Sequence, residues 1–225
     1  MANIGRKEKY YQDKSKILHA AAKLFLEKGY KNTTMNELAK LAKVSYGALF
    51  RTFEDKESVL CELVEFVLEA QFEISEKLLK DNNDKILFYA FETTLQLYLA
   101  ESSEHMREMY NVSYSLFNSS QKVYNTITNK LEYIFKEHLP HLETKDFYEL
   151  EIASAGIMRN FMSVPCNMYF TMERKIRRFL ETTFLIYRVD DNKIEEAINF
   201  VSKFNFKEIS KDLLDSLLDY LEKKT

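Results

Sequence analysis

The chain has 225 residues and a formal net charge of −3, and 46% of its residues are hydrophobic. It contains only 4 glycines and 2 prolines, so an almost wholly helical protein is expected, because strand-and-turn architectures use more of both. Two cysteines cannot make a disulfide framework, and no secretory leader or membrane-spanning run is visible, so we predict a cytoplasmic protein with no membrane partner.

The charge is unevenly distributed along the chain. Residues 1–60 hold 12 Lys and Arg against 7 Asp and Glu, whereas residues 61–225 hold 20 against 28. We call these segments the head and the body. A basic head on an acidic body favours attraction of phosphate at one end only. A chance asymmetry of surface charge is the alternative interpretation.

The first predicted helix covers residues 14–28, where apolar side chains repeat at helical spacing. Gly29 follows it, at a position that favours a left-handed backbone. The residues before this helix form a basic tail with no periodic pattern, interpreted either as a flexible arm or as a frayed end. Its basic residues are Arg6, Lys7, Lys9 and Lys14.

Two short helices follow within about twenty residues. Thr34 and Glu37 have the spacing of a capping box, which predicts a helix through about Ala42. After a turn, Ser45 is a good N-cap for a helix from Tyr46 to about residue 53. A helix-turn-helix of this kind can place small and polar side chains in the major groove of DNA.

Asp55 is expected to cap a long fourth helix that ends near Asn82 and joins head to body. Beyond it the sequence reads as amphipathic helices with no linker or internal repeat. The predicted helices of the body cover residues 84–101, 103–117, 120–138, 145–163, 172–188, 192–204 and 207–223.

The head resembles the N-terminal domain of the TetR family of bacterial transcriptional regulators. The order and spacing of a set of its residues carry the resemblance: Phe25, Gly29, Tyr30, Thr33, Thr34, Leu38, Ala39, Ala42, Val44, Ser45, Gly47, Leu49, Phe50, Phe53, Lys56 and Leu60. Lys43 departs from the pattern, where the family usually has glycine, and so does Phe50, where tyrosine is common. Phe50 is expected on the packing side of the third helix, with Val44, Leu49 and Phe53.

The resemblance implies an all-α fold with a three-helix helix-turn-helix DNA-binding domain at residues 1–60. A long helix joins it to a helical effector-binding and dimerisation domain at residues 61–225. It also implies a homodimer that reads two half-sites of a double-stranded DNA operator. Helices within residues 150–162 and 174–187 are the candidate dimer interface. The function expected is a repressor released by a small hydrophobic effector.

The predicted DNA-binding residues sort into two roles. Phosphate contacts are assigned to Thr34, Lys43, Ser45 and Lys56. The exposed reading positions are Tyr46, Gly47, Ala48, Arg51 and Thr52. Arg51 can contact guanine or a phosphate, and Tyr46 a thymine methyl or a phosphate. Gly47 allows close approach of DNA or tight packing on the second helix.

Aromatic and methionine side chains are abundant in the body, and most must be core. A few polar tips among them suggest a ligand cavity for an apolar or aromatic effector. The candidate lining residues are Met106, Tyr110, Tyr114, Phe117, Asn118, Asn160 and Asn167.

No catalytic constellation is visible, so we predict a protein that is not an enzyme and has no metal or cofactor. His138 and His141 flank a proline that breaks any shared helical face, and too few glycines exist for a phosphate-binding loop. The alternative function is a helical small-molecule carrier or adaptor that has lost sequence-specific DNA binding.

Overall fold

Helices account for the regular structure of the described chain. A computed structural model describes the backbone of residues 2–224 and the side chains from residue 7 to 224. The helices are α1 (Ala2–Lys28), α2 (Met35–Ala42), α3 (Tyr46–Thr52), α4 (Lys56–Leu78), α5 (Lys85–Glu101), α6 (Glu104–Ser113), α7 (Phe117–Phe135), α8 (Thr144–Ser163), α9 (Met172–Ile186), α10 (Asp191–Val201) and α11 (Phe206–Lys223). The prediction of an all-helical fold with an N-terminal helix-turn-helix is confirmed.

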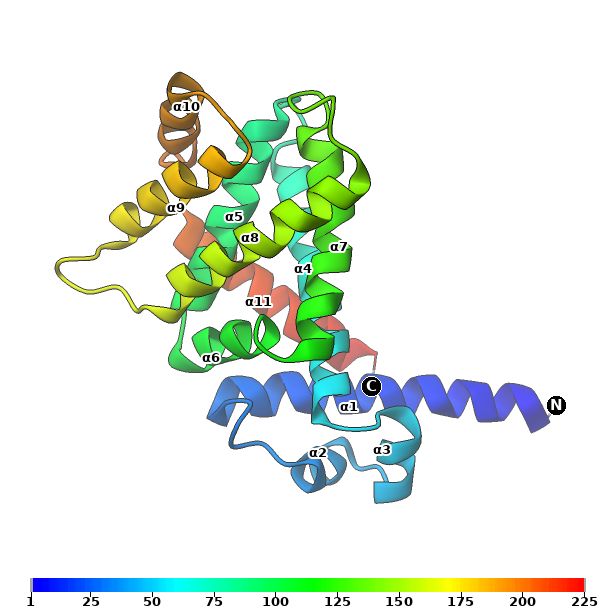
Figure 1. The fold of residues 1–225 in the computed structure, drawn as a ribbon. Coiled ribbons are helices and arrows are strands. Elements are labelled where there is room, and N and C mark those ends of the chain that lie inside the picture. Colours follow the sequence, from blue (N-terminus) through cyan, green and yellow to red (C-terminus); the bar gives the residue numbers. More distant parts are fainter. Residues whose placement is uncertain (1, 225) are drawn as a thin grey trace.

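The helices of the head form a separate layer at one end of the molecule (Figure 1). α1 runs across this end, and α2 and α3 lie on its outer side. Local capping positions the two short helices as predicted. Thr34 and Glu37 form the capping box of α2, and Ser45 Oγ accepts from the Ala48 amide at 3.1 Å to cap α3.

The first helix begins twelve residues earlier than predicted, at Ala2 instead of Lys14. Apolar periodicity finds only the part of a helix that is packed, and the added turns project beyond the rest of the head (Figure 1). The predicted flexible arm or frayed end is therefore helical along its backbone. Lys7 and Lys9 lie on this extension and are exposed, whereas the side chain of Arg6 lies outside the described residues.

α4 rises from the head into the body, where the other helices surround it and α5 (Figure 1). The break near Asn82 is confirmed, because α4 ends at Leu78 and Asp84 caps α5 by accepting from two backbone amides. The body encloses one large cluster of buried apolar side chains, which includes stacked rings of Phe135 and Tyr187 with centroids 4.0 Å apart.

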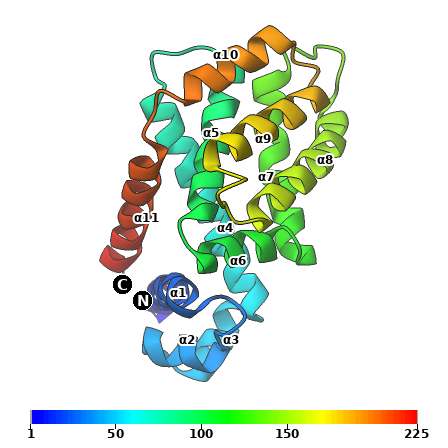
Figure 2. The same ribbon diagram turned by 90° about the vertical axis from the view of Figure 1, so that its left-hand side faces the viewer.

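The last helix, α11, returns to the head, which the sequence did not indicate. It descends along one side of the body until its end lies beside α1 (Figure 2). Leu221 on α11 belongs to the buried apolar cluster of the head, and Tyr220 stacks on Phe66 of α4 with ring centroids 5.3 Å apart. Head and body are therefore joined both by α4 and by α11.

Among the described residues, no helix is both long enough and apolar enough to cross a membrane.

Candidate DNA-binding surface and effector cavity

α3 presents a short row of side chains to solvent. Tyr46, Gly47 and Arg51 are exposed, as predicted for reading positions. A Cβ added to Gly47 would meet only the tip of Arg51, at 3.7 Å, so Gly47 is not packed against the second helix. Of the two interpretations of Gly47, the structure favours an open surface.

Two positions of α3 were assigned to the wrong side of the helix. Ala48 is 6% exposed, because it shares the inner face of this short helix with Leu49, so it is not a reading residue in this structure. Phe50 is 40% exposed and was expected to pack inward. Its ring instead lies beside Tyr46, with centroids 4.5 Å apart, and enlarges the aromatic part of the outer surface.

The hydroxyl groups of Thr34, Ser45 and Thr52 differ in whether their hydrogen is already used in a hydrogen bond within the chain. Thr34 Oγ1 donates to Glu37 at 2.8 Å, and Thr52 Oγ1 donates to the Ala48 carbonyl at 2.9 Å. Ser45 Oγ is only an acceptor in its cap. Ser45 therefore keeps a free hydroxyl hydrogen for a phosphate oxygen, whereas Thr34 is poorly suited to that predicted contact.

Lys43 ends α2 in a left-handed conformation, with φ 54° and ψ 38°. This geometry explains why a glycine suits the position, since a side chain there costs roughly 1–2 kcal/mol. Lys43 is exposed beside the reading helix. The strained backbone of Lys43 therefore lowers the stability of the fold, at a position where its positive charge faces the solvent next to the candidate DNA surface.

Replacing Lys43 with glycine is expected to raise the free energy of unfolding by about 0.5–1 kcal/mol, because the left-handed strain is relieved. The same change should lower the salt slope of DNA binding by about one, since one phosphate contact is lost. Chemical denaturation and salt titration of binding measure the two effects. Lys40→Gly, inside α2, is the control and should destabilise by about 1 kcal/mol.

Lys56 does not present its ammonium group to a phosphate. Nζ donates to the backbone carbonyls of Tyr30 and Thr33, both at 2.8 Å, and lies 4.3 Å from the centre of the Tyr30 ring. Burial lowers the pKa of Lys56. The geometry indicates that the ammonium group of Lys56 holds the loop between α1 and α2 in place.

A basic groove beside the reading helix was missed in the sequence. Lys16, His19 and Lys23 on α1 line it together with Lys43. Their spacing of three and four residues places them on one face of α1. The spacing of these basic residues can be read from the sequence. The sequence does not show that the end of α2 lies against the same face of α1 and forms the other side of the groove.

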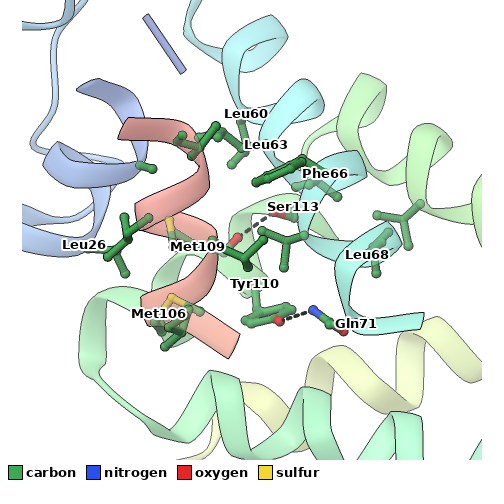
Figure 3. A pocket seen from close by; sticks show the side chains of 18 of the residues that line it. Leu26, Leu60, Leu63, Phe66, Leu68, Gln71, Met106, Met109, Tyr110 and Ser113 are labelled. Atoms are coloured by element: carbon green, nitrogen blue, oxygen red, sulfur yellow. Dashed lines mark hydrogen bonds between the residues drawn. The ribbon is translucent and has the colours of Figure 1, made fainter. Parts of the chain in front are cut away.

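An apolar cavity of about 80 Å³ lies where head and body meet. α1, α4, α6 and α11 supply its walls, as Figure 3 shows for Leu26, Leu60 and Met106. Its lining is Ala22, Leu26, Leu60, Leu63, Val64, Phe66, Val67, Leu68, Gln71, Met106, Met109, Tyr110, Ser113, Tyr114, Val123, Leu214, Leu217, Leu218 and Leu221. The predicted ligand residues Met106, Tyr110 and Tyr114 are thus brought together.

Polar groups are few in this cavity. Gln71 Nε2 donates to the Tyr110 hydroxyl at 2.7 Å, across the cavity from the apolar end (Figure 3). Gln71 Oε1 is buried and has no hydrogen-bond partner among the described residues. Because an unsatisfied buried acceptor is costly, this oxygen suits a ligand that can donate a hydrogen bond.

Four predicted ligand residues lie outside the cavity. α6 ends at Ser113, four residues earlier than expected, so Phe117 begins α7 and is 75% exposed. Asn118 is exposed, and its amide donates to Glu57 at 2.8 Å. Asn160 lies on the exposed face of α8, and Asn167 Oδ1 accepts from two amides of its own loop.

A second cavity of about 30 Å³, whose lining mixes apolar and polar side chains, lies in the body. Glu92 on α5 and Glu151 on α8 line it, and each is only 4% exposed. Burial raises the pKa of Glu92 to about 7 and that of Glu151 to about 8. No pattern in the sequence indicates that these carboxyls are buried, because a glutamate inside an amphipathic helix normally faces solvent.

These carboxyls predict a stability that falls as the pH rises. The folded chain keeps their protons up to about pH 7 and 8, whereas the unfolded chain releases them near 4.5. Between those values the folded state binds more protons, so raising the pH favours unfolding. Glu151→Gln should lose part of this slope and be the more stable protein at pH 8, by about 1–2 kcal/mol. Denaturation at pH 5 and pH 8 measures it. An unchanged slope would contradict the assignment.

Head and body also touch through α6. His105 Nδ1 lies 2.8 Å from the Leu26 carbonyl, and Glu108 accepts from the Lys31 amide at 3.1 Å. Gly29, with φ 85°, lies directly against Glu108, where a side chain would collide with the carboxylate. The end of α1 is therefore held to the same helix, α6, that forms one wall of the apolar cavity.

α8 and α9 have an outer face that the body does not cover. Ile152 and Leu185 are large apolar residues exposed on it, and Gly156 has open space around it. The loop that follows α8 projects from the body (Figure 1) and carries Met168 and Tyr169, each more than 80% exposed. Exposed apolar side chains over neighbouring elements mark an interaction surface.

His138 Nε2 lies 3.0 Å from the carbonyl of Arg188. Across the described residues, no group of three or more His, Cys, Asp or Glu side chains is arranged to hold a metal ion.

Comparison with known proteins identifies the family to which this chain belongs. The family model described as bacterial regulatory proteins of the tetR family matches residues 17–63. The HTH-type transcriptional regulator QacR of Staphylococcus aureus is 30% identical over 131 residues, which cover 55% of this chain and 69% of that protein. The chain belongs to the TetR family.

Two further comparisons agree with that membership. The TetR-family chain is 30% identical to YvkB of Bacillus subtilis, an uncharacterised HTH-type transcriptional regulator, over 50% of this chain and 57% of that one. The crystal structure of RolR in complex with resorcinol superimposes with a TM-score of 0.67 over 88% of this chain and 97% of that chain, at 15% identity, which shows a shared fold. The named relatives are transcriptional regulators and not enzymes.

Proposed function

We propose that this TetR-family regulator is a repressor that binds an operator as a dimer and leaves it when a small, largely apolar effector enters the cavity between head and body. The observation that carries the proposal is the position of that cavity, whose walls include both α1 of the head and α6 and α11 of the body. Residues 1–60 then read DNA, and residues 61–225 bind the partner and, together with α1, the effector.

In this proposal α3 enters the major groove with Tyr46, Phe50 and Arg51 toward the bases. Ser45 and Lys43 contact phosphates beside it, and the basic groove of α1 extends the contact along the backbone of the DNA. Gly47 allows the duplex to approach closely. Lys56 supports the loop of the head and takes no direct part.

The outer face of α8 and α9 is the proposed dimer interface. Its exposed apolar residues and the open space at Gly156 allow two copies to approach closely. A two-fold arrangement of heads would read two half-sites, so a near-palindromic operator is expected.

Effector binding must change the shape of the cavity in order to act. A void of about 80 Å³ is small beside the roughly 150 Å³ that accommodates benzene in an engineered protein. An aromatic effector must therefore move the walls, and Met106 and Met109 are adaptable enough to allow it. Because α6 holds the end of α1 through Glu108 and His105, such a movement displaces the head.

RolR was solved with resorcinol, a small aromatic molecule. That supports an effector of similar size for this chain. Gln71 Oε1 supplies a buried acceptor for the donor group of such a ligand.

The test begins with selection of genomic DNA fragments by the purified protein at two salt concentrations. A short near-palindrome should be recovered at both. Small aromatic compounds are then screened for release of that fragment. Val67→Phe, which fills the cavity, should keep DNA binding and lose release, because the effector has no room. Salt-sensitive binding without sequence preference would instead favour a carrier, and unchanged release by Val67→Phe would place the effector elsewhere.

A further inference from the structure

α11 is fixed to the body at its first residue. Phe206 is 2% exposed, and its ring centre lies 4.8 Å from that of Phe91 and 5.5 Å from that of Tyr98. Asn205 caps the helix by accepting from the Glu208 amide. Aromatic contacts therefore anchor the start of α11 inside the body.

The rest of α11 is held by apolar contacts. One face of the helix lines the apolar cavity with four leucines: Leu214, Leu217, Leu218 and Leu221. Within the described part of the chain, the side-chain hydrogen bonds of residues 207–221 stay inside the helix and its cap, and no ion pair involves these residues. α9, by contrast, is tied to α5 by the ion pair of Lys175 with Glu101. Because apolar attraction has no preferred direction, this part of α11 can leave the body without breaking a hydrogen bond or an ion pair.

α11 is also the outermost wall of the cavity. Figure 2 shows it along one side of the body, and the side chains opposite its leucines are exposed, among them Lys211, Asp215 and Asp219. The other walls are packed against further helices: α1 against α2, α4 against α7 and α6 against α8. Outward movement of α11 therefore opens the cavity without displacing a second helix.

The far end of α11 lies on the head. Leu221 is 6% exposed in the apolar cluster of the head, and Tyr220 stacks on Phe66 of α4. Ala22 and Leu26 of α1 line the same cavity as the leucines of α11. When α11 moves outward, α1 loses these contacts, and the head loses one of its supports on the body.

We propose that α11 is a gate that turns about its anchored start, admits the effector to the apolar cavity and frees α1 in the same movement. This inference rests on the proposed effector function and adds the route of entry and the element that carries binding to the head. The closed gate is the state that binds the operator, so DNA shifts α11 toward the closed state and the effector shifts it toward the open one.

Hydrogen exchange of the intact protein tests the gate without a ligand. A detached helix of 18 residues is only marginally stable in water, so the amides of an open α11 exchange readily. Those of residues 210–221 should be protected at least about tenfold less than the amides in the middle of α5. The operator fragment recovered by genomic selection should slow their exchange about fivefold or more.

Leu221→Ala removes the contact of the gate with the head. It should speed exchange in residues 210–221 about tenfold or more, because the closed state loses a buried side chain. Leu131→Ala is the matched control, since Leu131 is 1% exposed in the body on α7. It should leave exchange in α11 unchanged. Circular dichroism establishes that both variants are folded.

A covalent clamp tests the route of entry. Phe66→Cys and Tyr220→Cys are joined by a short bismaleimide, since the two rings that they replace are 5.3 Å apart between centres. The free cysteines are removed by Cys61→Ser and Cys166→Ser. The clamped protein should bind the operator as tightly as the same protein without the linker. It should take up toluene, measured by exchange NMR, at least about tenfold more slowly.

The results separate this inference from the function on which it rests. Exchange of α11 in step with α5, at the rate of global unfolding, would overturn the gate. Exchange in α11 that the operator does not slow would overturn its coupling to the head, and unchanged uptake of toluene by the clamped protein would overturn the route of entry. Toluene that binds neither form would count against an aromatic effector in this cavity and not against the gate, which the exchange measurement decides.

Discussion

Arg51→Ala is expected to weaken binding to the matched operator by roughly 5- to 150-fold, with little loss on unrelated DNA. An arginine that contacts a base contributes about 1–3 kcal/mol of discrimination, and Arg51 is exposed at the outer surface of α3. Tyr46→Ala should have an effect of the same kind, because Tyr46 lies on the same surface and supports the Phe50 ring. Competition between matched and single-base-altered operators measures both.

Lys23→Ala is the matched control, since it also removes one positive charge from the head. Lys23 lines the groove of α1 and not the reading helix. Its loss should weaken binding to every sequence alike and lower the salt slope by about one. If Arg51→Ala and Lys23→Ala gave the same uniform loss, α3 would not be the reading helix.

Lys175→Met is expected to cost about 2–4 kcal/mol of stability. Lys175 is 1% exposed, and its Nζ contacts Glu101 at 2.7 Å and the Val164 carbonyl at 2.6 Å. Removing it leaves the largely buried Glu101 carboxylate with less compensation. Glu101 also accepts from Arg107 and from the Cys166 amide, which reduces the loss. Denaturant unfolding measures it.

The control is Arg178→Met, one turn further along the same helix. Arg178 pairs with Glu181, but its side chain is 64% exposed, so the pair is screened by solvent and its loss should cost less than about 0.5 kcal/mol. Because Lys175 also fixes the loop between α8 and α9, its replacement should weaken dimerisation as well. Similar stability losses in the two variants would contradict the view that burial makes the difference.

Much of the head was predictable because its signals are local. The capping boxes, the Ser45 cap and the left-handed Gly29 each depend on residues within four positions of one another. The order of the helices in the body followed from the same kind of evidence, and most ends agreed within about three residues. The prediction failed for the end of α6 and for the start of α1, where no cap or breaker marks the boundary of the helix.

The errors at the candidate sites came from contacts between distant parts of the chain. Lys56 was assigned to phosphate because it lies at a helix start, but the carbonyls it binds belong to a loop more than twenty residues earlier. Phe50 and Ala48 exchanged roles because a seven-residue helix is too short for periodicity to fix its buried face. The asparagines expected in the cavity are exposed, since a polar tip among aromatics does not show which side faces inward.

The sequence by itself determined the fold class, the helix-turn-helix and the family pattern, because caps, periodicity and the scarcity of glycine act within a few residues. Only the tertiary structure decided which side chains meet: the return of α11 to α1, the cavity between them, and the burial of Glu92 and Glu151 inside the body. Burial depends on neighbours that lie up to a hundred residues away, and the desolvation that raises the pKa of the two carboxyls exists only once those neighbours are packed.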